Sequence, residues 1–463
     1  MKSMNLVKHL AVIASVFLLS YSSSQLSSLV RSDDCTQRSA AWFNSLAYKS
    51  TDGGATSAVL VDVQRDFVAH KLNKIVIDTL DHATIYLGTN NGVFKSTNEG
   101  CSWKESSGGF TERYIRDLVI DPADPSNLYA LTSMITGNIY RIPPSHRVFI
   151  TADRGNNWQA VNLDFELTCL TIDSSNPATL YLGARNQDVL GIYKSTDRGR
   201  TFAFLQQIDN AADFAITYIV VDPKDVSVLY YGVNNTIGSF SNDRGGIYRS
   251  VDGGTTSARI FHPDDSSVTN SFVIDPDDLT TLYNAGNRGI FKSTDGGRNW
   301  QITSISLPTE NSLVLDKHSN LYFSIAGPVC GSKYGCPSFL SRSTDGGRSW
   351  SRVPALINSS LVVDPSNTSI LYCAGFIPPP ELASVSITGK RVVVEGSFIH
   401  EGTVIKVNGE RQKTEFRPLT SDFSYVRLVS KKGAKNVAPG QVVLVSVEEA
   451  DGVEVSVSVL KPN

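Results

Sequence analysis

The 463-residue sequence lacks long apolar runs, an excess of either charge and the short motifs of common catalytic centres. Its 42 Lys and Arg nearly balance 45 Asp and Glu. The resulting formal net charge of −3 gives no basic footprint for nucleic acid or an anionic membrane. No HExxH, GxSxG, P-loop or EF-hand sequence is present. We therefore expect no metal, no cofactor and no nucleic-acid partner.

The N-terminus has the composition of a secretory signal. Lys2 and Lys8 flank the start of the chain, an apolar run follows at residues 10–19, and mostly small residues follow at 20–24. A membrane-spanning helix needs about 20 apolar residues, so the run is short for an anchor, although an uncleaved anchor stays the alternative. The pattern predicts a signal peptide at residues 1–24, no transmembrane anchor after cleavage, and a bacterial protein that is secreted or held at the cell surface.

Cysteine is scarce, and the even number of six in an exported chain favours disulfides. Cys330 and Cys336 are close enough in the sequence to close one loop. Metal binding is the weaker alternative, because no CxxC pair and no His at ligand spacing accompany the cysteines. The other four allow three pairings and are Cys35, Cys101, Cys169 and Cys373.

Glycine, with 35 residues, and other turn-forming residues are abundant, as in a turn-rich β-protein. A strand–turn–strand pattern, clearest in LVIDPADPSNLY at residues 118–129, occurs seven times. Its Asp recurs every 41 to 53 residues, a spacing that fits one four-stranded propeller blade per repeat. The turn aspartates are Asp78, Asp121, Asp173, Asp222, Asp275, Asp316 and Asp364.

A second pattern, a tight hairpin that is clearest in STDGGRNW at residues 293–300, also occurs seven times. A short Asp side chain in such a turn accepts hydrogen bonds from nearby N–H groups and hydroxyls, and the Gly two residues later supplies a positive φ. The pattern resembles the Asp-box, or BNR, repeat of sialidases, sortilin-type receptors and other propellers. Its structural residues are Asp52, Asn98, Asp153, Asp197, Asp252, Asp295 and Asp345.

The two patterns are offset along the chain. The repeats begin with a hairpin half and end with a strand–turn–strand half at residues 361–374. Together the two halves complete a seventh blade, which closes the ring and leaves no exposed sheet edge. The sequence thus predicts an all-β fold with a seven-bladed Asp-box β-propeller at residues 36–376. Closure would bring Cys35 near Cys373, so a disulfide between them is one hypothesis.

After the propeller region the pattern changes. The Pro-rich residues 377–381 predict a stiff linker. Val-rich alternating strands in residues 382–463, with Asn-Gly and Asp-Gly turns, predict a small β-sandwich. The stretch GSFIHEGTVIKVNGERQKTEF resembles the IPT/TIG domain of bacterial surface proteins, which implies an Ig-like fold.

Blade connectivity places both regular turns on one face and the irregular loops on the opposite face, where loops on a rigid scaffold usually bind ligands. Arg and Tyr are the usual anchors of binding surfaces, and the irregular loops contain several. Solvated loop residues are the alternative for each of them. The predicted ligand-binding residues are Arg113, Tyr114, Arg116, Tyr140, Arg141, Arg244 and Tyr334.

The tetrapeptide YRIP at residues 140–143 is similar to a sialidase motif whose Arg binds the substrate carboxylate. Here it falls in a mid-chain loop, without a second and third Arg or a Tyr/Glu pair to accompany it. Glycoside hydrolysis in general needs two carboxylates at a suitable distance. The four candidate carboxylates lie outside the repeat core, and nothing in the sequence places two of them at such a distance. These are Asp213, Asp264, Asp265 and Glu310.

A propeller fold does not determine function by itself. The resemblance to sortilin-type receptors and photosystem assembly factors favours a monomeric, non-catalytic protein whose loop face binds a protein or a polysaccharide. The alternative is a glycoside hydrolase. It would be either sialidase-like or similar to xyloglucan-cleaving hydrolases, which share the repeat but use two propellers.

Overall fold

The computed structural model is all-β in the residues that it describes, with strands β1 to β36 and no helix. The described part of the chain contains no helix that is long and apolar enough to cross a membrane. Their strands form nine four-stranded antiparallel sheets. The described residues are 46–53, 58–59, 72–110, 114–133, 147–161, 163, 165–186, 189–209, 214–235, 245–262, 269–286, 288–305, 310–326, 339–353, 360–375, 381–397, 403–419, 425–448 and 454–462.

In the described repeat region, six sheets each consist of four consecutive strands. The first three of these sheets are the following. The first contains β3 (Leu72–Ile77), β4 (Ile85–Thr89), β5 (Gly92–Ser96) and β6 (Lys104–Glu105). The second contains β7 (Tyr114–Ile120), β8 (Leu128–Ser133), β9 (Arg147–Thr151) and β10 (Gln159–Val161). The third contains β11 (Glu166–Ile172), β12 (Leu180–Asn186), β13 (Val189–Ser195) and β14 (Ala203–Asp209).

The next three sheets repeat this arrangement. The fourth contains β15 (Phe214–Val221), β16 (Leu229–Asn235), β17 (Gly246–Ser250) and β18 (Ala258–Phe261). The fifth contains β19 (Thr269–Ile274), β20 (Leu282–Gly286), β21 (Gly289–Ser293) and β22 (Gln301–Ile305). The sixth contains β23 (Glu310–Leu315), β24 (Leu321–Ala326), β25 (Phe339–Ser343) and β26 (Ser351–Val353).

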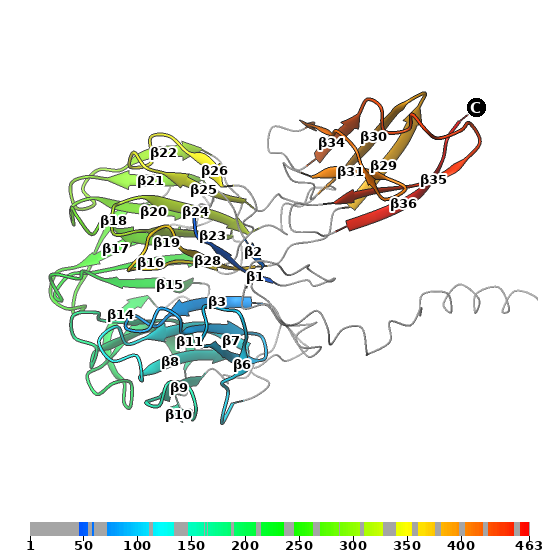
Figure 1. Cartoon of the computed structure of the whole chain (residues 1–463). Helices are drawn as coiled ribbons and strands as arrows, with labels where there is room; N and C mark the ends of the chain where they lie inside the picture. The colour runs from blue at the N-terminus through cyan, green and yellow to red at the C-terminus, as the bar shows by residue number, and fades with distance from the viewer. Residues whose placement is uncertain are drawn as a thin grey trace, which may run out of the picture. The chain divides into compact units, whose positions relative to one another are not determined.

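The closing sheet joins the two ends of the repeat region. Its strand order is β2 (Ala58–Val59), β1 (Leu46–Ser50), β28 (Leu371–Gly375) and β27 (Ser360–Val363). β1 pairs with β28 over its whole length, so the blue strand β1 lies beside the yellow strand β28 (Figure 1). The prediction that the first hairpin and the last half-repeat form one sheet is confirmed.

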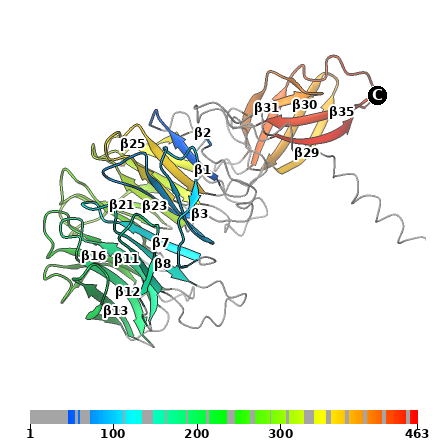
Figure 2. The same ribbon diagram turned by 60° about the horizontal axis from the view of Figure 1, so that its bottom comes forward.

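The first strand of each sheet belongs to an inner ring. The ring consists of β3, β7, β11, β15, β19, β23 and β27, each in contact with the next, and β27 contacts β3. Four-stranded sheets that follow one another around a closed ring are the architecture of a β-propeller. Figure 2 shows β11, β12 and β13 side by side within one of these sheets.

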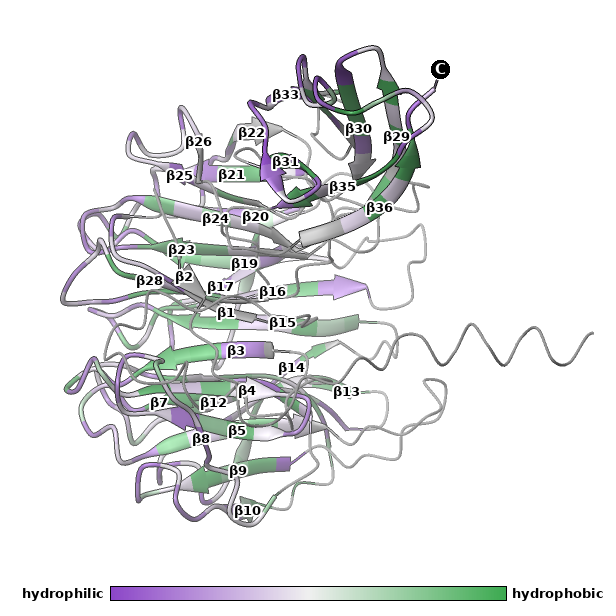
Figure 3. Cartoon of the chain, turned by 45° about the vertical axis from the view of Figure 1, so that its right-hand side comes forward, coloured by the Kyte–Doolittle hydropathy of each residue, from purple (hydrophilic) through white to green (hydrophobic). Residues whose placement is uncertain are grey.

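The hydrophobic core lies between neighbouring sheets. Between the second and third sheets, Tyr129 and Leu131 of β8 pack in one buried cluster with Leu180 and Leu182 of β12. Each fully buried side chain of this size contributes about 1.5–3 kcal/mol of transfer free energy, so the ring is stabilised interface by interface. Figure 3 shows apolar residues concentrated in the strands and hydrophilic residues in many of the turns.

In every sheet of the ring, the strand next to the inner strand contains a buried tyrosine. Each of these tyrosines is at most 2% exposed. Six of the seven have a Lys or Arg of the neighbouring strand over the ring, 5.0 to 5.7 Å from its centroid. In the second sheet, Ile150 stands opposite Tyr129 instead. The pairs are Tyr86–Lys95, Tyr181–Lys194, Tyr230–Arg249, Tyr283–Lys292, Tyr322–Arg342 and Tyr372–Lys49.

Each of the six Asp boxes that are described in full is a closed hydrogen-bond network, as the box of the sixth sheet illustrates. The hydroxyl of Ser343 donates to Asp345 Oδ1 at 2.8 Å and accepts from the N–H of Gly347 at 2.8 Å. The N–H and hydroxyl of Ser349 donate to the two oxygens of the same carboxylate at 2.9 and 2.5 Å. Gly347 has φ of 87°, as predicted, and Gly346 before it also has a positive φ, of 69°.

Hydrogen bonds tie the Asp boxes to the turns that follow the inner strands. The N–H of Arg198 donates to the carbonyl of Ala178 in the turn of its own sheet at 3.0 Å. Its Nη1 lies 2.6 Å from Asp121 Oδ2 in the turn of the preceding sheet. Arg154 makes the equivalent ion pair with Asp78 at 2.5 Å. Both turn types therefore lie on one face, as predicted, which we call the turn face.

The Asp boxes should make the stability of the protein sensitive to acid. Hydrogen bonds from the Ser349 side chain, its N–H and Ser343 lower the pKa of Asp345 from 3.8 to about 2. A carboxylate whose folded-state pKa is depressed stabilises the fold above its unfolded-state value and loses this contribution as pH falls from about 4 to about 2. We therefore expect the melting temperature to fall over this window.

An Asp345→Asn variant provides the matched test, because the first sheet already has Asn at this position. Asn98 Oδ1 accepts from the N–H of Ser102 at 2.9 Å and its Nδ2 donates to the Ser102 hydroxyl at 3.0 Å. The variant should fold at neutral pH and lose less stability between about pH 4 and 2 than the wild type, measured by thermal melts. An equal acid loss in both proteins would show that Asp345 does not contribute to it.

The structure corrects one disulfide hypothesis. Cys169 and Cys373 are buried free thiols, so the predicted Cys35–Cys373 bond is wrong. Cys373 stands in the interior of the closing sheet, opposite Tyr48 of β1, and burial raises the pKa of its thiol. Burial likewise raises the pKa of Cys169 to about 12. Cys101 is disulfide-bonded. Cys35, Cys330 and Cys336, and with them the predicted Cys330–Cys336 bond, lie outside the described residues.

The C-terminal part contains two further sheets around their own core. One has the order β29 (Glu381–Thr388), β30 (Arg391–Ser397), β34 (Tyr425–Ser430) and β33 (Glu415–Pro418). The other has the order β32 (Glu410–Arg411), β31 (Val404–Val407), β35 (Val442–Glu448) and β36 (Glu454–Leu460). Val392 and Val394 of β30 share one buried cluster with Val443 and Val445 of β35, so the two sheets pack face to face.

Candidate functional site

The structure describes two of the seven predicted ligand-binding residues, and both lie on β7 of the inner ring. The hydroxyl of Tyr114 donates to Asn73 Oδ1 at 3.2 Å, and Arg116 Nη1 donates to the carbonyl of Leu167 at 3.4 Å. Both bonds link β7 to a neighbouring inner strand. The other five lie outside the described residues and are Arg113, Tyr140, Arg141, Arg244 and Tyr334.

Carboxylates are rare on the inner strands. Within the described bounds of these seven strands, the Asp and Glu residues are Asp117 on β7, Glu166 on β11 and Glu310 on β23. Glu166 and Glu310 are each the first residue of their strand, at the end away from the turn face. The side chain of Glu310 lies outside the description, as do Asp213, Asp264 and Asp265.

Basic side chains of neighbouring strands hold the two described carboxylates. Asp117 Oδ1 lies 3.0 Å from Lys74 Nζ on β3. Glu166 Oε2 lies 3.1 Å from Arg185 Nη1 on β12, and Arg185 Nη2 donates to the carbonyl of Phe214. The Asp117 side chain is 20% exposed and that of Glu166 is 47% exposed, so solvent reaches both. We call these two ion pairs, Lys74–Asp117 and Arg185–Glu166, together with Arg116, which links β7 to β11, the inner-ring polar cluster.

The turn aspartates, by contrast, are fully engaged in structural hydrogen bonds. Asp121 Oδ1 accepts from the N–H groups of Ala123 and Asp124 at 2.9 and 3.1 Å, and its Oδ2 pairs with Arg198. All seven turn aspartates are at most 7% exposed. A buried carboxylate with its lone pairs occupied cannot reach a substrate, so these residues are excluded from catalysis.

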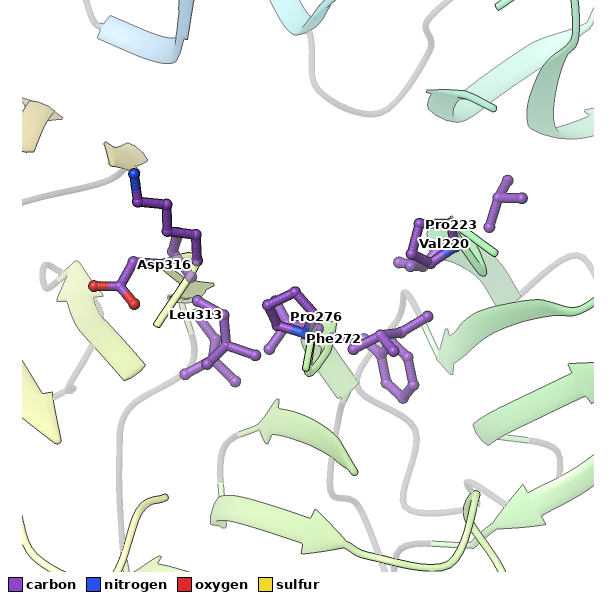
Figure 4. Close-up of a pocket in the computed structure, with 12 residues that line it drawn as sticks. Val220, Pro223, Phe272, Pro276, Leu313 and Asp316 are labelled. Atoms are coloured by element: carbon purple, nitrogen blue, oxygen red, sulfur yellow. The ribbon is translucent and has the colours of Figure 1, made fainter. Parts of the chain in front are cut away.

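One described cavity lies at the turn-face ends of β15, β19 and β23 and has a volume of about 450 Å³. Figure 4 shows Phe272 and Pro276 between Val220 and Pro223 on one side and Leu313 and Asp316 on the other. The carboxylate of Asp316 accepts from the N–H of His318 at 2.8 Å and from Asn320 Nδ2 at 2.7 Å. This cavity is therefore an apolar surface without a free carboxylate, and the polar cluster is the better candidate for chemistry.

No part of the described chain gathers three or more His, Cys, Asp or Glu residues that could hold a metal ion. The polar cluster offers two carboxylates, together with Lys and Arg groups that donate hydrogen bonds. Such a set can bind a hydroxylated substrate and transfer protons.

The closed ring and the repeated boxes define a β-propeller of the Asp-box type. The family model described as sortilin, neurotensin receptor 3, matches residues 91–237, less than half of the chain. A xyloglucanase of Paenibacillus sp is 23% identical over 278 residues, which cover 51% of this chain and 26% of that protein. A xyloglucanase of Hypocrea jecorina is 26% identical over 212 residues, which cover 41% and 23%. The alignments thus span about a quarter of these relatives.

Solved structures agree in fold. The GH74 xyloglucanase of Xanthomonas campestris matches with a TM-score of 0.52 at 16% identity, over 71% of this chain and 58% of that one. An ancestral GH74 enzyme matches with a TM-score of 0.53 at 14% identity, over 89% and 59%. At this level of identity the likeness concerns the propeller architecture.

These relatives correct the functional prediction. The sequence favoured a non-catalytic binding protein, whereas the curated relatives are xyloglucanases and thus glycoside hydrolases. The prediction of a non-catalytic protein was wrong because the Asp-box repeat, on which it rested, is shared by receptors and hydrolases alike. Of the two hydrolase alternatives, these relatives favour the xyloglucanase over the sialidase.

Proposed function

We propose that the protein is a glycoside hydrolase that cleaves β-glucan chains of the xyloglucan type. The observation that supports this most strongly is the alignment with the Paenibacillus xyloglucanase, which extends over 51% of the chain. Xyloglucanases of Acetivibrio thermocellus and Hypocrea jecorina also align with parts of this chain, and each of them is much longer than the aligned segment.

We propose the finer architecture as follows. The seven sheets of the ring are the blades of a seven-bladed propeller, and the two C-terminal sheets form an Ig-like domain of the IPT/TIG type. Residues 1–24 are a secretory signal, and the protein acts outside the cell. An extracellular location suits a polymeric substrate, which does not enter cells.

We assign the chemistry to Asp117 and Glu166. Glycoside hydrolysis uses one carboxyl group as acid and a second carboxylate as base or nucleophile. These two residues lie on neighbouring inner strands, β7 and β11, and are open to solvent. Arg116 adjoins Asp117 and donates to the carbonyl of Leu167, the residue after Glu166, and in this proposal it also donates to sugar hydroxyls.

We propose that the reaction is inverting, from the offset of the two residues along their strands. Asp117 precedes its turn aspartate by four residues and Glu166 precedes its own by seven, as the sequence shows. An offset of three residues corresponds to about 10 Å along a strand, part of which a Glu side chain can span. Inverting enzymes hold their carboxyl groups about 6.5–9.5 Å apart, and retaining enzymes about 5–5.5 Å. The larger separation leaves room for the attacking water.

The direct test is a substrate panel with the purified protein. Xyloglucan, mixed-linkage glucan, unbranched cellulose oligosaccharides and sialyllactose would be incubated with the protein, and new reducing ends or free sialic acid measured. We expect release from xyloglucan and none from sialyllactose. Absence of release from every β-glucan would overturn the proposal.

A further inference from the structure

A second described cavity lies on the third sheet. None of its lining residues belongs to the inner-ring polar cluster, although Phe165 directly precedes Glu166 and Asn186 directly follows Arg185. Its volume is about 490 Å³, within the about 300–1,000 Å³ typical of small-molecule sites. It is lined by four aromatic residues, one amide and one valine. These residues are Phe165, Asn186, Val189, Tyr193, Phe202 and Phe204.

The aromatic rings of this cavity form a connected series. Phe165 stacks on Tyr193 with their centroids 4.5 Å apart and an interplanar angle of 28°. Tyr193 in turn meets Phe204 edge to face at 5.3 Å and 74°. Packing on both sides fixes the ring of Tyr193, which is 5% exposed, whereas Phe204 is 52% exposed. The series thus ends in a ring presented to solvent.

Exposure of Phe204 is unusual within this chain. The described large hydrophobic residues with comparable exposure are otherwise aliphatic, and Phe204 is the aromatic one among them. Leaving so large a ring in water forfeits the transfer free energy that burial would provide. A ligand that covers the ring would recover it.

Two polar groups also line the same cavity. The amide of Asn186 is exposed and within hydrogen-bonding reach of the Tyr193 hydroxyl. A pyranose ring has a face of C–H groups and a rim of hydroxyls. The electron-rich face of an aromatic ring attracts the C–H groups, while an amide and a phenol can pair with the hydroxyls.

We propose that this aromatic groove is a binding subsite for the sugar rings of a β-glucan chain, built from residues other than the proposed cleavage pair. The proposal rests on the proposed function for its ligand class, because an enzyme that acts on a polymer gains from a second contact with the chain. Phe204 stacks on a sugar ring, and Asn186 and Tyr193 hold its hydroxyls.

The fifth sheet supplies a matched control. Ile302 of β22 pairs with Phe291 of β21 just as Phe204 of β14 pairs with Tyr193 of β13. Ile302 is 49% exposed, close to the value for Phe204. An Ile302→Ala variant therefore removes an equally exposed apolar side chain from the equivalent position of another sheet.

The test is calorimetric titration of the full chain with cellohexaose and a xyloglucan heptasaccharide, in the cold to suppress turnover. We expect Phe204→Ala to weaken binding about tenfold, as removal of one stacking ring typically does. Phe204→Trp should preserve binding, Tyr193→Phe and Asn186→Ala should each weaken it, and Ile302→Ala should leave it unchanged. Thermal melts of each variant verify the fold.

The outcomes separate this proposal from the proposed function. If the protein hydrolyses xyloglucan but binds oligosaccharides equally well with and without Phe204, the proposed subsite is wrong and the proposed hydrolase function stands. Binding that depends on Phe204, in a protein that cleaves nothing, would support the groove and overturn the enzyme. Absence of oligosaccharide binding, or binding only of an apolar dye at Phe204, would overturn the groove.

Discussion

Replacing Glu166 by Gln is expected to lower the rate of xyloglucan cleavage about 10³-fold, within the 10²–10⁴-fold range of a lost general acid or base. Gln keeps the size of the side chain and can still hydrogen-bond Arg185, which lies 3.1 Å from the carboxylate. It cannot supply or take up a proton. Asp117→Asn should have an effect of similar size for the same reason.

Glu310→Gln is the matched control for this loss. Glu310 is also the first residue of an inner strand, but β23 is separated from β11 by β15 and β19 in the ring. We expect its variant to retain most of the activity. Initial rates of reducing-end release from xyloglucan would be compared for all three variants and the wild type. Equal activity of Glu166→Gln and the wild type would refute the assigned pair.

Replacing Asp121 by Ala should destabilise the propeller by about 3 kcal/mol, the lower end of the range for breaking a buried charge pair. The carboxylate is 0% exposed, accepts two backbone N–H groups and pairs with Arg198. Alanine leaves the N–H groups of Ala123 and Asp124 buried without an acceptor, which adds to the loss. The Arg198 side chain is 40% exposed and can turn to solvent, which limits the loss of stability.

Asp121→Asn separates the two contributions. Its Oδ1 can still accept from both N–H groups, so this variant loses the ion pair alone. We expect a cost of about 1 kcal/mol for it, in keeping with a partly exposed pair. Urea denaturation followed by tryptophan fluorescence measures both variants. Similar losses for Ala and Asn would show that the ion pair, and not the turn, provides most of the stability.

The repeats made most of the fold predictable. Regular Asp, Gly and Tyr positions report local turns and strands, so the sheets and the closure of the ring by β1 and β28 could be predicted from spacing. Register across strands has no such local signal. The Lys and Arg groups over the buried tyrosines were missed, because each pair joins residues on two strands. The same holds for the buried free thiol of Cys373.

The candidate site was harder to predict. The sequence directed attention to long loops, and of the residues chosen there only Tyr114 and Arg116 lie in the described part. Asp117, next to Arg116, was overlooked because it falls inside a repeat unit whose aspartates are mostly structural. The useful signal was available, since Asp117 and Glu166 are charged residues on inner strands that are elsewhere mainly apolar or neutral.

The most direct measurement of the central claim is proton NMR of xyloglucan during the first minutes of cleavage by the purified protein. We predict new reducing ends that appear first as the α-anomer, because an inverting pair of carboxylates converts the β-linkage into an α-product. We also predict that these signals are absent with Glu166→Gln. A first product in the β-configuration would contradict the assigned pair, and the absence of any new reducing end would contradict the proposed function itself.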